Sequence, residues 1–417
     1  VTADGKADIL ADSDTVIVNV NNNIGLAKEG TDPPAGQREP EDALSRLNEM
    51  GKGSGPHAGL NASDIANAAT GAIEGSEKAQ SAWQQAKAMI KEVQDVDDAF
   101  NDWERKANPD KETSAYAGSV NANVSVSNVT AQIGENAVVK AGSDLNVKAN
   151  VDNITVNEAG AVSANGKTGG GGAIVTDVIV NDAIASIGSN ASVDAKRNML
   201  LDANQDYVVV QAGVGAAVAK STSGAGTVGV LVQTNNTKSL IGEGAKINQT
   251  YKDDKADENQ TVSLNAKNKN VIVKGLGALG IQAGGQGASG KAVGGTVDTN
   301  VIVNNATAEI QGTAANKAVV NATKDVNLTA ENKNKIINAD VAGAAAMQGT
   351  AASGLVSSNI VINETSSGIK NANITAGENV NLTADADFSE VAVAGAVSIG
   401  NQNAYGATLR VDVISDN

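Results

Sequence analysis

Two glycine-containing motifs resemble phosphate-binding loops. The first, Gly275–Gly280, reads Gly-Leu-Gly-Ala-Leu-Gly after a strand-like run, and Asp298 lies eighteen residues beyond it. In a dinucleotide-binding fold this motif opens a helix whose N-terminus holds the pyrophosphate. Here the following residues, 281–295, read IQAGGQGASGKAVGG, which is not a helical pattern. We therefore interpret the motif as a tight turn or a stack of small residues in a repeated strand scaffold.

The second motif, Gly166-Lys167-Thr168, resembles the end of a P-loop. Five residues separate Gly160 from Gly166 where the P-loop has four, and four glycines follow Thr168 where a helix should begin. We expect neither motif to bind a cofactor.

The sequence also gives little support for a metal site or for hydrolytic catalysis. Four acidic residues lie within 253–258 but lack the spacing of a calcium-binding loop, so a solvated acidic loop is the simpler interpretation. The segment 284–290, GGQGASG, is similar to a calcium-binding nonapeptide repeat, but it occurs once and has Ser289 where Asp is required. His57 is the only histidine, cysteine is absent and no serine elbow is present. We predict no metal site, no catalytic residues and a protein that is not an enzyme.

The composition narrows the class of protein further. Aromatic residues make up only 2% of the 417 residues, which is low for a compact globular core. The net charge of −16 argues against nucleic acid as a main partner, because nucleic-acid binding requires a basic face. No apolar run is long enough to span a bilayer, so we expect no membrane insertion by this segment. The N-terminus lacks the pattern of a signal peptide, and the chain begins and ends in mid-repeat, so we expect it to be part of a longer protein.

Internal repetition is the strongest signal in the sequence. Four kinds of segment recur in order: an L-x-A piece, a V-x-V piece, an Ala/Gly-rich piece, and a piece that ends in isoleucine. The isoleucine positions are 133, 187, 241, 310 and 369, and the extra length between some of them falls in polar stretches such as 249–260. The pieces alternate apolar and polar residues, which is typical of strands. Examples of the first piece are ADILA (7–11), LNVKA (145–149), MLLDA (199–203), VSLNA (262–266) and VNLTA (326–330 and 380–384).

This pattern predicts an all-β fold, a right-handed parallel β-helix (β-solenoid). Strands without intervening helices, a register that repeats along the chain, and asparagines near turns that could stack into ladders all favour it over a sandwich, barrel or propeller. With three strands per rung we expect two rungs per repeat. This gives roughly twelve rungs and a rod on the order of 60 Å long.

Residues 33–113 break the pattern, so we divide the chain into a β-helix start (1–32), an α-helical insertion in a rung loop (33–113) and β-helix repeats (114–417). Residues 76–107 read as one long helix with an apolar stripe that includes Trp83, Phe100 and Trp103. The stripe either holds the insertion together or pins it to the rod, or it forms a partner-binding knob on a rigid stem. The uninterrupted counterpart is 396–413, where Ala404-Tyr405 matches Ala115-Tyr116.

Residues 159–188 and 341–386 resemble the long passengers of filamentous-haemagglutinin-like exoproteins, including leukotoxin-type and large adhesin passengers. The resemblance covers 1–30 and 114–417. It implies export by a type V or two-partner pathway, an extracellular or outer-surface location, and adhesion to a cell-surface protein or glycan. As further partners we expect more repeats of the same long chain and side-by-side self-association. No functional residue of the family can be transferred, because the matching positions are structural.

Two other functions remain open. The chain could be part of a secreted, leukotoxin-like toxin whose active part lies elsewhere. It could also be a β-helix enzyme acting on polysaccharides, although no carboxylate pair and no row of aromatic sugar platforms stands out. Sugar turnover would favour the enzyme.

Overall fold

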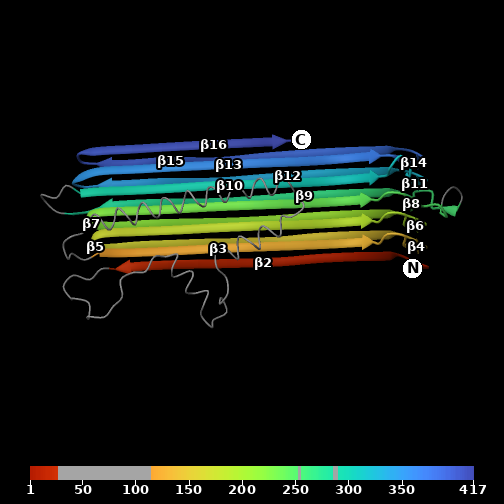
Figure 1. The fold of residues 1–417 in the computed structure, drawn as a ribbon, viewed down its shortest axis with the longest axis horizontal. Helices are drawn as coiled ribbons and strands as arrows, with labels where there is room; N and C mark the ends of the chain where they lie inside the picture. Colours follow the sequence, from red (N-terminus) through yellow and green to blue (C-terminus); the bar gives the residue numbers. More distant parts are fainter. Residues whose placement is uncertain (27–113, 252–254, 285–289) are drawn as a thin grey trace, which may run out of the picture.

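The computed structural model describes residues 1–26, 114–251, 255–284 and 290–417, and all of its regular elements are β-strands paired in parallel (Figure 1). The all-β prediction is therefore confirmed. The predicted helical insertion, with Trp83, Phe100 and Trp103, lies outside the described residues. The strands are β1 (Thr2–Ala3), β2 (Ala7–Leu26), β3 (Ser114–Ile133), β4 (Val138–Ala141), β5 (Leu145–Ile187), β6 (Ser192–Ala195), β7 (Met199–Ile241), β8 (Lys246–Ile247), β9 (Val262–Gln282), β10 (Gly290–Gln311), β11 (Ala318–Ala322), β12 (Val326–Ala346), β13 (Gly349–Lys370), β14 (Ala372–Ala376), β15 (Val380–Gly400) and β16 (Asn403–Asp416).

The chain winds in six solenoid-like turns, each made of one short strand and two long ones. The short strands form one sheet in the order β1-β4-β6-β8-β11-β14. The long strands form two facing layers, which are joined by a bend wherever the connection lies within the described residues. The first layer contains β2, residues 145–164 of β5, residues 199–219 of β7, β9, β12 and β15, and the second contains β3, residues 168–187 of β5, residues 222–241 of β7, β10, β13 and β16. We number the turns 1 to 6 from the N-terminus, so that turn 1 holds β1, β2 and β3.

The repeats found in the sequence lie in register in the structure. Ile187 pairs with Ile133 on one side and Ile241 on the other, and Ile310 pairs with Ile241 and Ile369. Paired positions are 54 residues apart in the early turns and 69 apart between Ile241 and Ile310. Part of that extra length lies in the loop between β8 and β9, as the polar composition of 249–260 predicted.

The expected number of rungs was wrong. One repeat makes one turn and not two, because the first and second recurring pieces join into a single strand of about twenty residues, such as β9. Six turns at the usual strand spacing give a stack about 30 Å high, while each long strand extends about 65 Å. The described part of the molecule is therefore wider along its strands than along its stack, as Figure 1 shows.

The interior changes in thickness along the strands. Next to the short sheet, all three sides contribute apolar side chains to one cluster, where Leu201, Val193 and Ile187 are buried. Near the bends the two layers approach closely. A Cβ added to Gly215 would lie 2.2 Å from the carbonyl oxygen of Gly226, and one added to Gly280 would lie 2.3 Å from that of Val293. The Ala/Gly-rich piece of each repeat is thus required by contact between the layers.

In turn 1 the described chain stops and resumes at the end of the layers where the other turns bend. β2 ends at Leu26 and β3 begins at Ser114, whereas in turn 2 the same register positions, Ala164 and Thr168, are separated by only three residues. When the strand pairings of the second layer are followed from turn 1 to turn 6, Ala115 and Tyr116 lie in the same rows as Ala404 and Tyr405. The predicted match is confirmed, and residues 27–113 stand in the chain where turn 2 has residues 165–167. Within the described residues, no helix is long and apolar enough to cross a bilayer.

Candidate functional site

Two bands of polar side chains run through the interior along the stack. We call them the asparagine ladder and the ionic band. The ladder consists of Asn181, Asn235, Asn304, Asn363 and Asp416, which occupy one row of the second layer. The ionic band lies nearer the bends and contains Asp177, Lys274, Asp298 and Asp340, all of which are buried.

Each asparagine of the ladder donates from its side-chain amide to the next turn. The Nδ2-to-Oδ1 distance is 2.9 Å from Asn181 to Asn235, 2.8 Å from Asn235 to Asn304 and 2.9 Å from Asn304 to Asn363. Asn363 in turn donates to Asp416 Oδ1 at 2.6 Å. Asn334 of the first layer joins the ladder by accepting from Asn304 and donating to Asn363. The ladder fixes the turns in register, because a shift by one residue would leave these buried amides without partners. It lies in mid-strand. Asn136 and Asn190 lie at the turns, as the sequence pattern predicted, and both adopt positive φ.

The ionic band is centred on Lys274 and Asp298, whose side chains form an ion pair and are both fully buried. The Lys274 ammonium also donates to Asn300 Oδ1 at 2.7 Å, and Asp298 Oδ2 accepts from Asn338 Nδ2 at 2.7 Å. Both charged groups therefore have hydrogen-bond partners, which a buried ion pair requires.

Asp340 lies one turn further on and is less well satisfied. Its Oδ2 accepts from the Ser357 hydroxyl at 3.0 Å, while its Oδ1 has no hydrogen-bond partner among the described residues. Burial, together with the nearby charge of Asp298, raises the pKa of Asp340 to about 7. Burial also raises the pKa of Asp177, although side-chain donors on Gln211, Asn123 and Asn157 oppose that shift.

These carboxylates are enclosed between the layers, so a substrate cannot reach them in this fold. Asp177, Asp298 and Asp340 each have 0% of their surface exposed. Their hydrogen bonds and ion pairs connect the two layers and connect neighbouring turns. In the part of the chain that the structure describes, no group of three or more acidic or histidine side chains is arranged to hold a metal ion.

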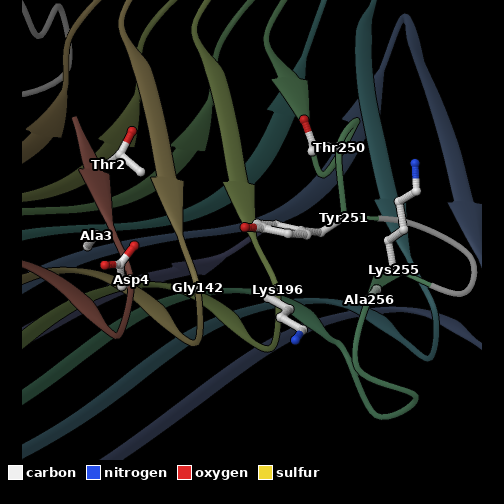
Figure 2. Close-up of a pocket in the computed structure, with 9 residues that line it drawn as sticks. All are labelled: Thr2, Ala3, Asp4, Gly142, Lys196, Thr250, Tyr251, Lys255 and Ala256. Carbon is white, nitrogen blue, oxygen red and sulfur yellow. The ribbon is translucent and has the colours of Figure 1, made fainter.

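The candidate binding site is a groove on the outer side of the short sheet, about 640 Å³ in volume. Figure 2 shows the Tyr251 side chain extending from the loop after β8 over the neighbouring short strands. The loop is fixed there, because Thr250 N donates to the Asp194 carboxylate at 2.9 Å and the Gln260 amide donates to the Tyr251 carbonyl at 3.2 Å. The lining residues are Thr2, Ala3, Asp4, Gly142, Lys196, Thr250, Tyr251, Lys255 and Ala256. The lining combines one aromatic ring and threonine hydroxyls with both charge signs, Asp4 as well as two lysines, which suits a hydroxylated ligand.

The glycine motifs have structural positions. Gly275–Gly280 lies inside β9, so the strand-to-helix turn of a dinucleotide site is replaced by continuous strand. Gly166, Lys167 and Thr168 lie at the bend within β5. Of the acidic loop, Asp253 and Asp254 lie outside the described residues, as does His57. The Asp257 carboxylate accepts from the backbone of Asn259 at 2.9 Å.

No family model, curated protein or solved structure matches this chain. The described residues define an all-β protein of parallel strands with a solenoid-like arrangement.

Proposed function

We propose that this chain is a segment of a right-handed parallel β-helix that serves as a non-catalytic, surface-exposed or secreted adhesive scaffold. Right-handed winding is the usual chirality of parallel crossover connections. The resemblance of 159–188 and 341–386 to filamentous-haemagglutinin-like passengers supports the export route and the extracellular location.

One observation carries the scaffold role. The buried charges and amides are used to hold turns and layers together, as in the Lys274–Asp298 pair and the Asn235–Asn304 contact. A rigid stack of this kind can present binding segments at its edges. The groove around Tyr251 lies at the short sheet, and β2 ends and β3 begins, on either side of residues 27–113, at the opposite end of the layers. We propose that a cell-surface protein or glycan binds at one of these two places.

The alternative of a polysaccharide-active enzyme is less well supported, because the ionic-band carboxylates are closed to solvent. The toxin alternative remains a prediction from the resemblance.

Binding to cells and to a glycan array tests the proposal. The intact chain is compared with a variant in which residues 27–113 are replaced by the bend of turn 2, residues 165–167 (Asn-Gly-Lys), which spans the same register positions. A second variant, Tyr251→Ala, removes the ring from the groove, and Tyr405→Ala is its control, since Tyr405 is exposed (61%) away from the groove.

Loss of binding only in the bend variant would assign recognition to 27–113, and loss only in Tyr251→Ala would assign it to the groove. If the intact, folded chain binds no cell and no glycan, or if it cleaves polysaccharide, the adhesive function is wrong.

A further inference from the structure

The outer face of the first layer carries a broad, exposed apolar surface. We call it the apolar face. It comprises five outward positions in each of the six turns, which in turn 2 are residues 154, 156, 158, 160 and 162. Of these positions only Glu158 and Lys335 are charged, and Asn22 and Ser389 are the only other polar residues; the rest are Val, Ile, Leu, Ala or Gly.

The apolar side chains of this face are half-buried or exposed. Val214 is 51% exposed, Val341 49% and Leu279 45%. On the second layer the outward-facing valines differ among themselves: Val301 and Val303 are buried, whereas Val293 and Val356 are exposed. At strand and residue spacings the apolar face covers roughly 900 Å². Monomeric proteins rarely expose a contiguous apolar area of this size, and a stable protein interface buries about 800 Å² per partner.

We propose that two copies of this chain pack through their apolar faces about a two-fold axis that runs along the strands between turns 3 and 4. This interface goes beyond the adhesive function and does not depend on it. In this arrangement turn 1 of one copy faces turn 6 of the other, turn 2 faces turn 5, and turn 3 faces turn 4. Two flat sheets then pack face to face, as they do in β-sandwiches.

Under this two-fold axis, large side chains of one copy lie opposite small side chains of the other. Val214 of turn 3 would face Gly277 of turn 4 in the second copy, and Leu279 of turn 4 would face Ala216 of turn 3. No atom lies within 4 Å of a Cβ built on Gly277, so the space over this glycine is open. Val341 of turn 5 would face Gly160 of turn 2, where the Asn22 side chain of the same copy lies over the glycine and would have to move aside. Large side chains opposite small ones allow the two faces to interdigitate.

The same two-fold axis brings opposite charges together beside the apolar face. The next outward row holds Asp14, Asp152 and Asp206 in turns 1 to 3 and Lys269 and Lys333 in turns 4 and 5. The two-fold axis places Asp152 opposite Lys333 of the second copy and Asp206 opposite Lys269. Within one copy the acidic residues repel one another: partial burial first, and then the charges of Asp14 and Asp206, raise the pKa of Asp152. Within one copy Lys269 already pairs with Asp206 at 3.1 Å, and Lys333 with Glu331. The lysines of a second copy would add to these contacts and reduce the repulsion on Asp152, which no lysine among the described residues of its own copy contacts in an ion pair.

The fit is poorer at the ends of the row, where Asp14 would face Asp387 of turn 6. This contact lies at the margin of the interface, where solvent and salt screen the repulsion.

Sedimentation velocity of the full chain over a range of concentrations tests the interface. We expect a dimer that Val341→Lys converts to monomer. Val356→Lys is the matched control, because Val356 is a similarly exposed valine (43%) on the second layer and should leave the dimer intact. Circular dichroism establishes that each variant is folded.

A charge exchange tests the axis itself. Asp152→Lys or Lys333→Asp alone places like charges opposite each other, and each should weaken the dimer at least tenfold at low salt. The double variant should restore it, although the two residues lie three turns apart within one copy. A monomeric wild-type chain, disruption by Val356→Lys equal to that by Val341→Lys, or failure of the double variant to restore association would overturn the proposal. A monomer that floats with phosphatidylcholine vesicles, and loses this binding in Val341→Lys, would also overturn it and would assign the face to a lipid surface.

Discussion

Lys274 and Asp298 lie in opposite layers of the same turn, and their fully buried side chains form an ion pair between the layers. Asp298 also accepts from Asn300 at 3.1 Å and from Asn338 of the next turn at 2.7 Å. The pair therefore links the two layers within turn 4 and links turn 4 to turn 5. Its energetic value depends on both partners being present, because either charge alone would be buried without compensation.

Replacing Lys274 with Met should be strongly destabilising. The substitution leaves Asp298 beside Asp340 without a cation, and loss of one partner of a buried pair typically costs about 3–5 kcal/mol. Urea titration followed by circular dichroism measures the free energy of unfolding. The double variant Lys274→Met/Asp298→Asn removes both charges and should be more stable than Lys274→Met alone. A double variant as unstable as the sum of the two single variants would show that Lys274 contributes mainly through packing.

The pH dependence of stability should report on Asp340. Its pKa is about 7 in the folded protein, against about 3.9 in an unfolded chain. Between these values the folded state binds more protons than the unfolded state, so the contribution of Asp340 to stability falls as pH rises from about 4 to 7. Below this window Asp340 is neutral in both states and the penalty is absent.

Asp340→Asn removes this ionisation. We expect the variant to differ little from the wild type at pH 4 and to exceed its stability at pH 8 by a few kcal/mol, on the order of the three-unit pKa difference. Urea titrations at the two pH values measure the difference. Asp202→Asn, on the outward side of the same layer, is the control and should show no such gain. A difference between Asp340→Asn and wild type that is the same at both pH values would contradict the assignment.

The sequence predicted the stacking rows well and the interior poorly. Identical or similar residues recur at equivalent positions, so Ile133, Ile187 and Ile241 could be aligned from the repeats alone, and they pair in the fold. The number of turns could not be obtained in this way. A short junction within one strand, such as Asn204-Gln205-Asp206, is as polar as a bend between layers, such as Asn401-Gln402, so the repeat was divided into too many strands.

The ionic band was missed for a related reason. Lys274 occupies an inward position in a strand that alternates buried and half-buried residues, and this parity is a signal that was available in the sequence. Its partner Asp298 comes from the opposite layer, twenty-four positions along the chain. Pairing them requires knowing how β9 and β10 lie against each other. The size complementarity across the apolar face likewise emerges only once all six turns are in register.

The asparagine ladder should make a large contribution to stability through its central member. Asn304 accepts from Asn235 and donates to both Asn334 and Asn363. Asn304→Ala leaves several buried amide groups unpaired, at a cost of about 1–3 kcal/mol for each group. Asn381→Ala is the control, because its single side-chain bond, to Asn327 at 2.9 Å, lies on the surface. Thermal or urea unfolding should show a loss of several kcal/mol for Asn304→Ala and less than about 1 kcal/mol for the control. Equal losses would mean that the ladder is not what fixes the turns.

The close approach of the layers can be tested at two neighbouring glycines. A Cβ on Gly171 would lie 2.1 Å from the carbonyl oxygen of Ala216 in the facing layer, whereas a Cβ on Gly172 would have no atom within 4 Å. Gly171→Ala must push the layers apart, which typically costs about 1–3 kcal/mol. Gly172→Ala restricts the unfolded chain without a clash and should be neutral or stabilising by about 0.4–1 kcal/mol. Urea titration of the two variants therefore gives shifts of opposite sign if backbone contact between layers selects the Ala/Gly-rich piece of each repeat. Shifts of the same sign and size would mean that glycine is present at these positions only for its backbone flexibility.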